Sequence, residues 1–130
     1  MKKGLALWMA VLLLCTLTGC GRYRSHYRAV GFVHSAVSDH AFMSFFDFDG
    51  TMVFKLKCTD DHDAIRYTGK LQTGSAKVYY DCGGTKTELF SVHAGEEVDS
   101  SVNALRKGTV YVIVETDGAC ENGSFDFTVG

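Results

Sequence analysis

Apolar and polar residues alternate along most of the chain from about residue 30 onward. In residues 124–129, aromatic and aliphatic side chains take every second position, with polar side chains between them. Alternation of this kind places the two sets on opposite faces of a β-strand, so it predicts strands with one buried face. Residues 109–116 are apolar on both sides at their centre and predict a central strand.

Turn-forming residues separate the other alternating runs. Asp49-Gly50 lies between residues 42–48 and 51–57, and Asp-Gly in that setting predicts a hairpin because both turn positions need positive φ. Gly83-Gly84 predicts a second hairpin. Residues 117–123, rich in turn formers, predict a third, between 109–116 and the C-terminal strand.

The inward face of several strands follows from the same alternation. Met52, Phe54, Leu56 and Cys58 should share one face, and residues 65–71 repeat the pattern. With residues 29–37 as a first strand, we expect about seven or eight strands.

Residues 97–106 fit two kinds of element. Val98, Val102 and Leu105 have the i, i+4, i+7 spacing of one helix face, and Gly108 suits a helix C-cap. A short helix is therefore as compatible with this segment as a strand.

Short strands at roughly ten-residue spacing are typical of an all-β sandwich or barrel. We expect an antiparallel, jelly-roll-like β-sandwich that forms one domain over residues 29–130. Residues 20–130 number 111 of the 130 in the chain, which is enough for two packed sheets and one core.

The first nineteen residues have a different pattern. Lys2 and Lys3 precede an apolar run over residues 5–14, and small residues follow. This order is typical of a secretory signal peptide, and the apolar run is shorter than the roughly 20 residues that a membrane-spanning helix needs.

Leu17-Thr18-Gly19-Cys20 resembles the lipobox of bacterial lipoproteins at all four positions. The resemblance implies that Leu17, Thr18 and Gly19 are read by a dedicated signal peptidase, which cuts before Cys20. It also implies that the Cys20 thiol carries a diacylglycerol, which places the protein on the extracytoplasmic face of the cell membrane. A plain secretory signal with a nearby cysteine is the alternative.

Charge is distributed unevenly behind Cys20. Residues 20–28 carry three arginines and no acid, which is suited to a basic membrane-proximal tether or to a short solvated linker. From Asp39 onward there are 8 basic and 15 acidic residues, a net charge of −7. A basic stalk under an acidic body favours holding the body away from an anionic surface, and it argues against nucleic acid as a partner.

Candidate chemistry in the body is sparse. Residues 59–63, Thr-Asp-Asp-His-Asp, could bind calcium or set His62 beside an acid, but they lack the spacing of a calcium loop, so a solvated turn is favoured. Cys58, Cys82 and Cys120 allow one disulfide, with no basis for choosing the pair, and match no zinc pattern. Cysteine–histidine pairing with His34, His40, His62 or His93 is a further option. We therefore expect no metal or other cofactor.

Exposed aromatic rings are the other candidate feature, because sandwich modules often bind sugars through them. Tyr79 and Phe45 are the candidates for such outward rings, but core positions are favoured for the aromatic residues.

The body itself resembles small β-sandwich lipoproteins of Gram-positive gut bacteria and, more distantly, pre-peptidase C-terminal domains. The resemblance rests on Gly69-Lys70-Leu71, the Gly83-Gly84 turn, the strand 108–114 and the closing run 123–127. It implies a sandwich and no transferable catalytic residue. We expect a lipid-anchored, non-catalytic surface module with a protein or glycan ligand; a small extracytoplasmic hydrolase is the alternative.

Overall fold

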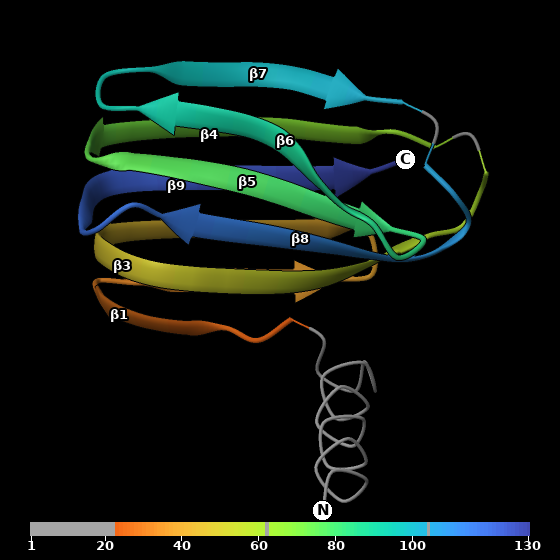
Figure 1. Ribbon diagram of the computed structural model, residues 1–130, viewed down its shortest axis with the longest axis horizontal. Coiled ribbons are helices and arrows are strands. Elements are labelled where there is room, and N and C mark those ends of the chain that lie inside the picture. Colours follow the sequence, from red (N-terminus) through yellow and green to blue (C-terminus); the bar gives the residue numbers. More distant parts are fainter. Residues whose placement is uncertain (1–22, 62, 104) are drawn as a thin grey trace, which may run out of the picture.

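The computed structural model describes residues 23–61, 63–103 and 105–130, and nine antiparallel β-strands make up its regular structure (Figure 1). The strands are β1 (His26–Val30), β2 (Val33–Val37), β3 (His40–Cys58), β4 (Ile65–Thr73), β5 (Ser75–Cys82), β6 (Lys86–His93), β7 (Glu97–Val102), β8 (Gly108–Thr116) and β9 (Cys120–Val129). The all-β expectation is confirmed, with nine strands in place of seven or eight. Across the described ranges, no helix has the length and apolar character to span a membrane.

The strands form two layers that share β3. The first half of β3 pairs with β2 and β9, and the order continues through β4 to β7; we call this layer the front sheet. The second half of β3 pairs with β8, and the order continues through β5 to β6; we call this layer the back sheet. The antiparallel sandwich is therefore confirmed, and one 19-residue strand joins its two sheets.

The predicted hairpin at Asp49-Gly50 is wrong, because β3 continues through it. Residues 51–58 pair with β8 instead of folding back onto residues 42–48. Gly50 has φ of +140°, and a Cβ there would lie 2.3 Å from the carbonyl oxygen of His26 in β1. The glycine therefore serves the close approach of β1 at the point where β3 passes between the sheets.

The predicted hairpin at residues 117–123 is also wrong. β8 pairs with β3 and β5, whereas β9 pairs with β3 and β4, so the connection crosses from the back sheet to the front sheet. Turn-forming residues indicate a reversal of the chain but not whether the two strands become neighbours. The Gly83-Gly84 hairpin between β5 and β6 is confirmed.

The helix alternative for residues 97–106 is wrong as well, because β7 occupies Glu97–Val102 and pairs with β4. Val98 and Val102 are four positions apart, an even number, so a strand also puts both on one face. Leu105 lies in the loop that follows β7, and its side chain is buried in the core.

The core lies between the sheets and is rich in phenylalanine. Phe48, Phe54, Phe125 and Phe127 are all at most 2% exposed. Across the side where β4 and β6 face each other, the rings of Tyr67 and Phe90 stack with their centroids 4.6 Å apart. The faces predicted from alternation are confirmed for residues 52–58 and 65–71.

The segment expected to form one strand over residues 29–37 contains two strands, β1 and β2. They lie end to end along β3. β1 pairs with residues 47–51 of β3 and β2 with residues 40–44, and Gly31-Phe32 interrupts them. Because β1 begins at His26, part of the segment interpreted as a tether belongs to the folded domain.

Candidate binding groove

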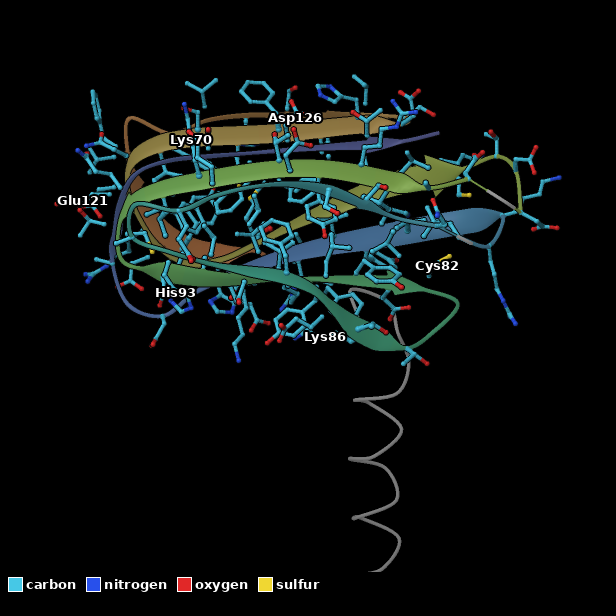
Figure 2. All side chains as sticks on the ribbon, turned by 90° about the horizontal axis from the view of Figure 1, so that it is seen from above. Lys70, Cys82, Lys86, His93, Glu121 and Asp126 are labelled. Carbon is cyan, nitrogen blue, oxygen red and sulfur yellow. The ribbon has the colours of Figure 1, made fainter. Side chains whose placement is uncertain are left out.

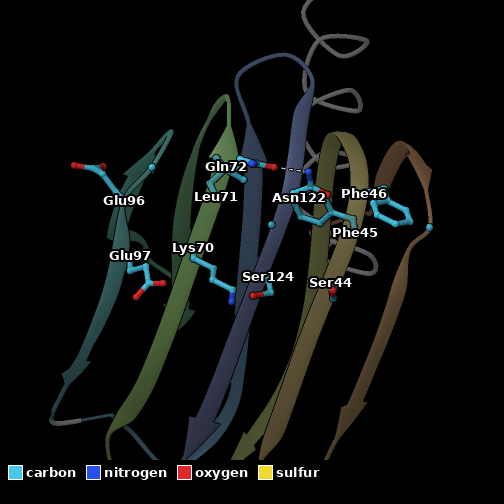
Figure 3. A pocket seen from close by; sticks show the side chains of 13 residues that line it. Ser44, Phe45, Phe46, Lys70, Leu71, Gln72, Glu96, Glu97, Asn122 and Ser124 are labelled. Atoms are coloured by element: carbon cyan, nitrogen blue, oxygen red, sulfur yellow. Dashed lines mark hydrogen bonds between the residues drawn. The ribbon is translucent and has the colours of Figure 1, made fainter.

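A hollow lies on the outer face of the front sheet (Figure 3). It has a volume of about 640 Å³ and crosses β3, β9 and β4 to the segment that leads into β7. An adjoining hollow of about 460 Å³ shares Lys70, Glu97 and Ser124 with it. Together they form a groove across the strands, which we call the front groove.

The register of the four strands sets the polar floor of the front groove. Ser44, Ser124, Lys70 and Glu97 are consecutive cross-strand neighbours, one from each strand. Ser44, Ser124 and Lys70 point outward because the residues on either side of each are buried, and Glu97 does so because the next residue, Val98, packs against the core. The floor therefore carries hydroxyl, ammonium and carboxylate groups in one row.

Phe46 forms the aromatic side of the front groove. It is 67% exposed, and its ring lies over Gly31, where an added Cβ would be 2.5 Å from Cδ2 of the ring. Inward positions in β3 are odd up to Phe45 and even from Phe48, so the alternation breaks at residues 46–47, while the register with β9 continues without a shift from Phe45 to Phe48. The break lies where β3 passes between the two sheets, and it leaves the Phe46 ring exposed.

Asn122 lies opposite Phe46 in the register of β9 with β3 and has φ of +50°, the sole positive value at a non-glycine position in the described ranges. Asparagine tolerates this left-handed conformation better than most residues. Its side-chain amide nitrogen donates a hydrogen bond to the side-chain oxygen of Gln72, as drawn in Figure 3. The pair holds two amide groups beside Phe46 at the end of the groove.

The charges around the front groove sum to a negative value. Glu96, Glu97 and Asp99 oppose Lys70 among its lining residues. Farther along the same face, the imidazole of His40 lies 3.0 Å from the Asp126 carboxylate. The groove therefore suits ligands that are neutral or cationic, and it disfavours polyanions.

The structure separates the two candidate outward rings. Phe45 is 4% exposed and belongs to the core, the alternative that the sequence favoured, so it offers no outward ring. The alternation already carried the signal, since Phe45 is in phase with the inward Ala41 and Met43, and Phe46 is not. Tyr79 lies on the back sheet, half-buried, with the Lys86 ammonium 4.4 Å from its ring centroid.

The acidic run at residues 59–63 supports a neighbouring loop. The Asp61 carboxylate accepts a hydrogen bond from the Lys107 backbone N–H at 3.0 Å, and the Asp63 carbonyl accepts one from Leu105. Within the described ranges no three histidine, cysteine, aspartate or glutamate residues gather as metal ligands do. His62 lies outside the described residues, as do Leu17, Thr18, Gly19 and Cys20.

The three cysteines of the body are free thiols, each donating to a backbone carbonyl. β8 lies between Cys58 in β3 and Cys82 in β5, which puts their Cα atoms at least about 9 Å apart, beyond the reach of a disulfide. Cys120 lies at the other end of the sandwich, beside Ser75. Burial raises the pKa of the Cys58 thiol and of the Cys120 thiol.

Thiol alkylation of the mature protein tests this arrangement. We expect three alkylated thiols in the body after denaturation without reductant. Under native conditions Cys82 should react first, because Cys58 and Cys120 are buried and hold less reactive thiolate. Mass spectrometry after timed quenching gives the order, and a denatured sample with only one reactive body thiol would contradict the structure.

No known family model and no curated protein sequence matches the chain. Among solved structures, it is similar to a periplasmic inhibitor of g-type lysozyme from Aeromonas hydrophila, with a TM-score of 0.50, 8% identity, and 72% of this chain and 88% of that chain covered. The pre-peptidase C-terminal domain of a Bacillus anthracis collagenase has a TM-score of 0.49 and 15% identity over 74% and 91% of the two chains.

A further similar structure is TmCBM61, solved with β-1,4-galactotriose, at a TM-score of 0.45 and 10% identity over 76% and 69% of the chains. At such identities the likeness concerns the fold alone. A pre-peptidase C-terminal domain, the class that the sequence resembles distantly, is thus among the structural neighbours.

Proposed function

We propose that the protein is a non-catalytic binding module, held on the extracytoplasmic face of the cell membrane by lipid on Cys20, and that its front groove binds a neutral glycan. The observation that carries the proposal is the exposed Phe46 ring beside a row of polar side chains in one groove. Glycans present apolar C–H faces and a dense set of hydroxyl groups. A ligand of that kind needs both an aromatic surface and hydrogen-bonding groups around it.

The polar residues of the groove support this ligand class. Asn122, Gln72 and Ser124 supply neutral donors and acceptors, while Lys70 and Glu97 supply charged ones for hydroxyl groups. The excess of carboxylates argues against acidic polysaccharides, so a neutral glycan fits better. One of the similar structures holds a neutral galactotriose, which accords with this choice of ligand for the test.

The anchor rests on the sequence. Leu17-Thr18-Gly19-Cys20 follows a basic and then an apolar segment, as a lipoprotein signal requires. Two acyl chains on one cysteine give stable membrane attachment where one would be marginal.

A glycan-array screen of the mature lipoprotein in detergent tests the ligand. For a glycan that binds, Phe46→Ala should weaken the affinity by more than about tenfold, because an aromatic ring that the ligand covers typically contributes about 2 kcal/mol or more. Tyr79→Ala is the matched control on the other sheet and should bind like the wild type. Equal binding by the Phe46→Ala protein, or a blank array, would overturn the assignment of a glycan to this groove.

A further inference from the structure

The lysines of the body gather on the outer face of the back sheet, opposite the front groove. Four of the six lie there, on β3, β5 and β6, and all four are exposed; they are Lys55, Lys57, Lys77 and Lys86. Figure 2 shows Lys86 on one side of the sandwich and Lys70 with Asp126 on the other. We call this surface the lysine face.

Acidic groups on the lysine face are mostly neutralised or buried. The Glu115 carboxylate lies 2.7 Å from the Lys86 ammonium. Asp81 is 1% exposed and accepts a hydrogen bond from the Gly84 backbone. Glu88 and, near the crossing point of β3, Asp47 and Asp49 are the remaining carboxylates on these strands, against Lys55, Lys57 and Lys77; Asp49 lies opposite Arg28 of β1. The net charge of −7 over the body therefore conceals one basic face, because most of the acidic residues lie elsewhere.

The N-terminal segment is fixed to this same face. The Tyr23 hydroxyl donates to the Asp81 carboxylate, and its ring centroid lies 5.2 Å from that of Tyr111 on β8. Tyr111 and Asp81 are cross-strand neighbours in the row that also holds Lys55 and Lys86. The Ser25 hydroxyl accepts a hydrogen bond from the Val53 backbone N–H at 2.8 Å. The segment therefore runs over the middle of the lysine face.

Chain length then limits how far the anchor can be from the lysine face. Cys20 precedes Tyr23 by three residues, so their Cα atoms are at most about 11 Å apart in any conformation. That span is too short for a stalk that would hold the domain away from the bilayer.

We propose that the lysine face lies against an anionic bilayer when Cys20 is lipidated, so that the front groove on the opposite sheet is directed away from the membrane. The inference rests on the lipid anchor of the proposed function. Charge complementarity selects the lysine face as the surface that contacts the anionic bilayer, because this face is basic while the lining of the front groove is acidic. This orientation replaces the expectation that an acidic body is held away from the membrane surface, because the basic and the acidic groups concentrate on different faces.

Lysine labelling of the lipidated protein tests the orientation. The protein is reconstituted into vesicles of phosphatidylcholine with phosphatidylglycerol, treated briefly with an amine-acetylating reagent, and analysed by peptide mass spectrometry against the same protein in detergent. We expect Lys55, Lys57 and Lys77 to be acetylated several-fold more slowly on the vesicles, while Lys70 in the front groove reacts at the same rate in both. Raising the salt to about 1 M, where the Debye length is about 3 Å, should remove most of the protection.

The outcomes separate the anchor from the orientation. Protein that fails to float with the vesicles would contradict the lipid anchor. Protein that floats but shows no protection of the three lysines, or equal protection of Lys70, would overturn the orientation alone. The double variant Lys55→Glu, Lys57→Glu should still float but lose protection at Lys77, whereas Lys70→Glu should keep it.

Discussion

Replacing Phe48 with alanine is expected to lower the free energy of unfolding by about 3–5 kcal/mol, a large part of the roughly 5–15 kcal/mol typical of a domain. Phe48 is fully buried, and its ring lies within 5.3 Å, centroid to centroid, of the rings of Tyr27, Phe32 and Phe45. The substitution leaves a cavity where β1, the link to β2 and β3 meet. Urea unfolding followed by circular dichroism measures the change.

Phe46→Ala is the matched control for this prediction. The two phenylalanines are two residues apart in one strand, so unbroken alternation would place both on the same face. Because the alternation breaks at residues 46–47, Phe46 is exposed while Phe48 is buried, and truncation of Phe46 should change the free energy of unfolding by no more than about 0.5 kcal/mol. Similar losses for both variants would contradict the register of β3.

Replacing Cys20 with serine is expected to move the protein from the membrane fraction to the soluble or unprocessed pool, with a loss of membrane-bound mature protein of more than about 100-fold. Serine provides no thiol for the acyl-bearing group, and each buried methylene that is lost removes about 0.8 kcal/mol of membrane affinity. Labelling of growing cells with radioactive palmitate, followed by fractionation, measures both attachment and location.

Cys15→Ser serves as the control for the anchor. Cys15 lies in the same N-terminal segment but follows Leu14, which is too large for the small-residue position of a lipobox. The Cys15→Ser protein should therefore incorporate label as the wild type does. Label retained by the Cys20→Ser protein would show that the lipid is attached at another residue, and it would contradict Cys20 as the anchor.

The two hairpin predictions that were wrong share one cause. Asp49-Gly50 and residues 117–123 both have turn chemistry, yet neither joins neighbouring strands of one sheet. Local sequence reports where the chain can bend, because backbone conformation depends on the residue itself. Pairing partners depend on residues far along the chain, as with Thr51 of β3 and Glu115 of β8.

The front groove shows the same limit at the level of a site. Phe46 was predictable as an outward residue from its alternation with Ala41, Met43 and Phe45, but its neighbours in the groove were not. Lys70, Ser124 and Glu97 become adjacent to the β3 residues only through the pairing of β9, β4 and β7. A row of side chains from four strands has no signature in any one of them.

By itself, the sequence determined the all-β class, the single sandwich core and the buried faces of most strands, because period-two alternation and apolar burial are local properties. The tertiary structure alone decided how β3 is shared between two sheets, that no disulfide joins the body cysteines, and that most lysines of the body lie on the face opposite the acidic front groove. Each of these depends on which strands are neighbours, and that choice is made by the packing of the whole core.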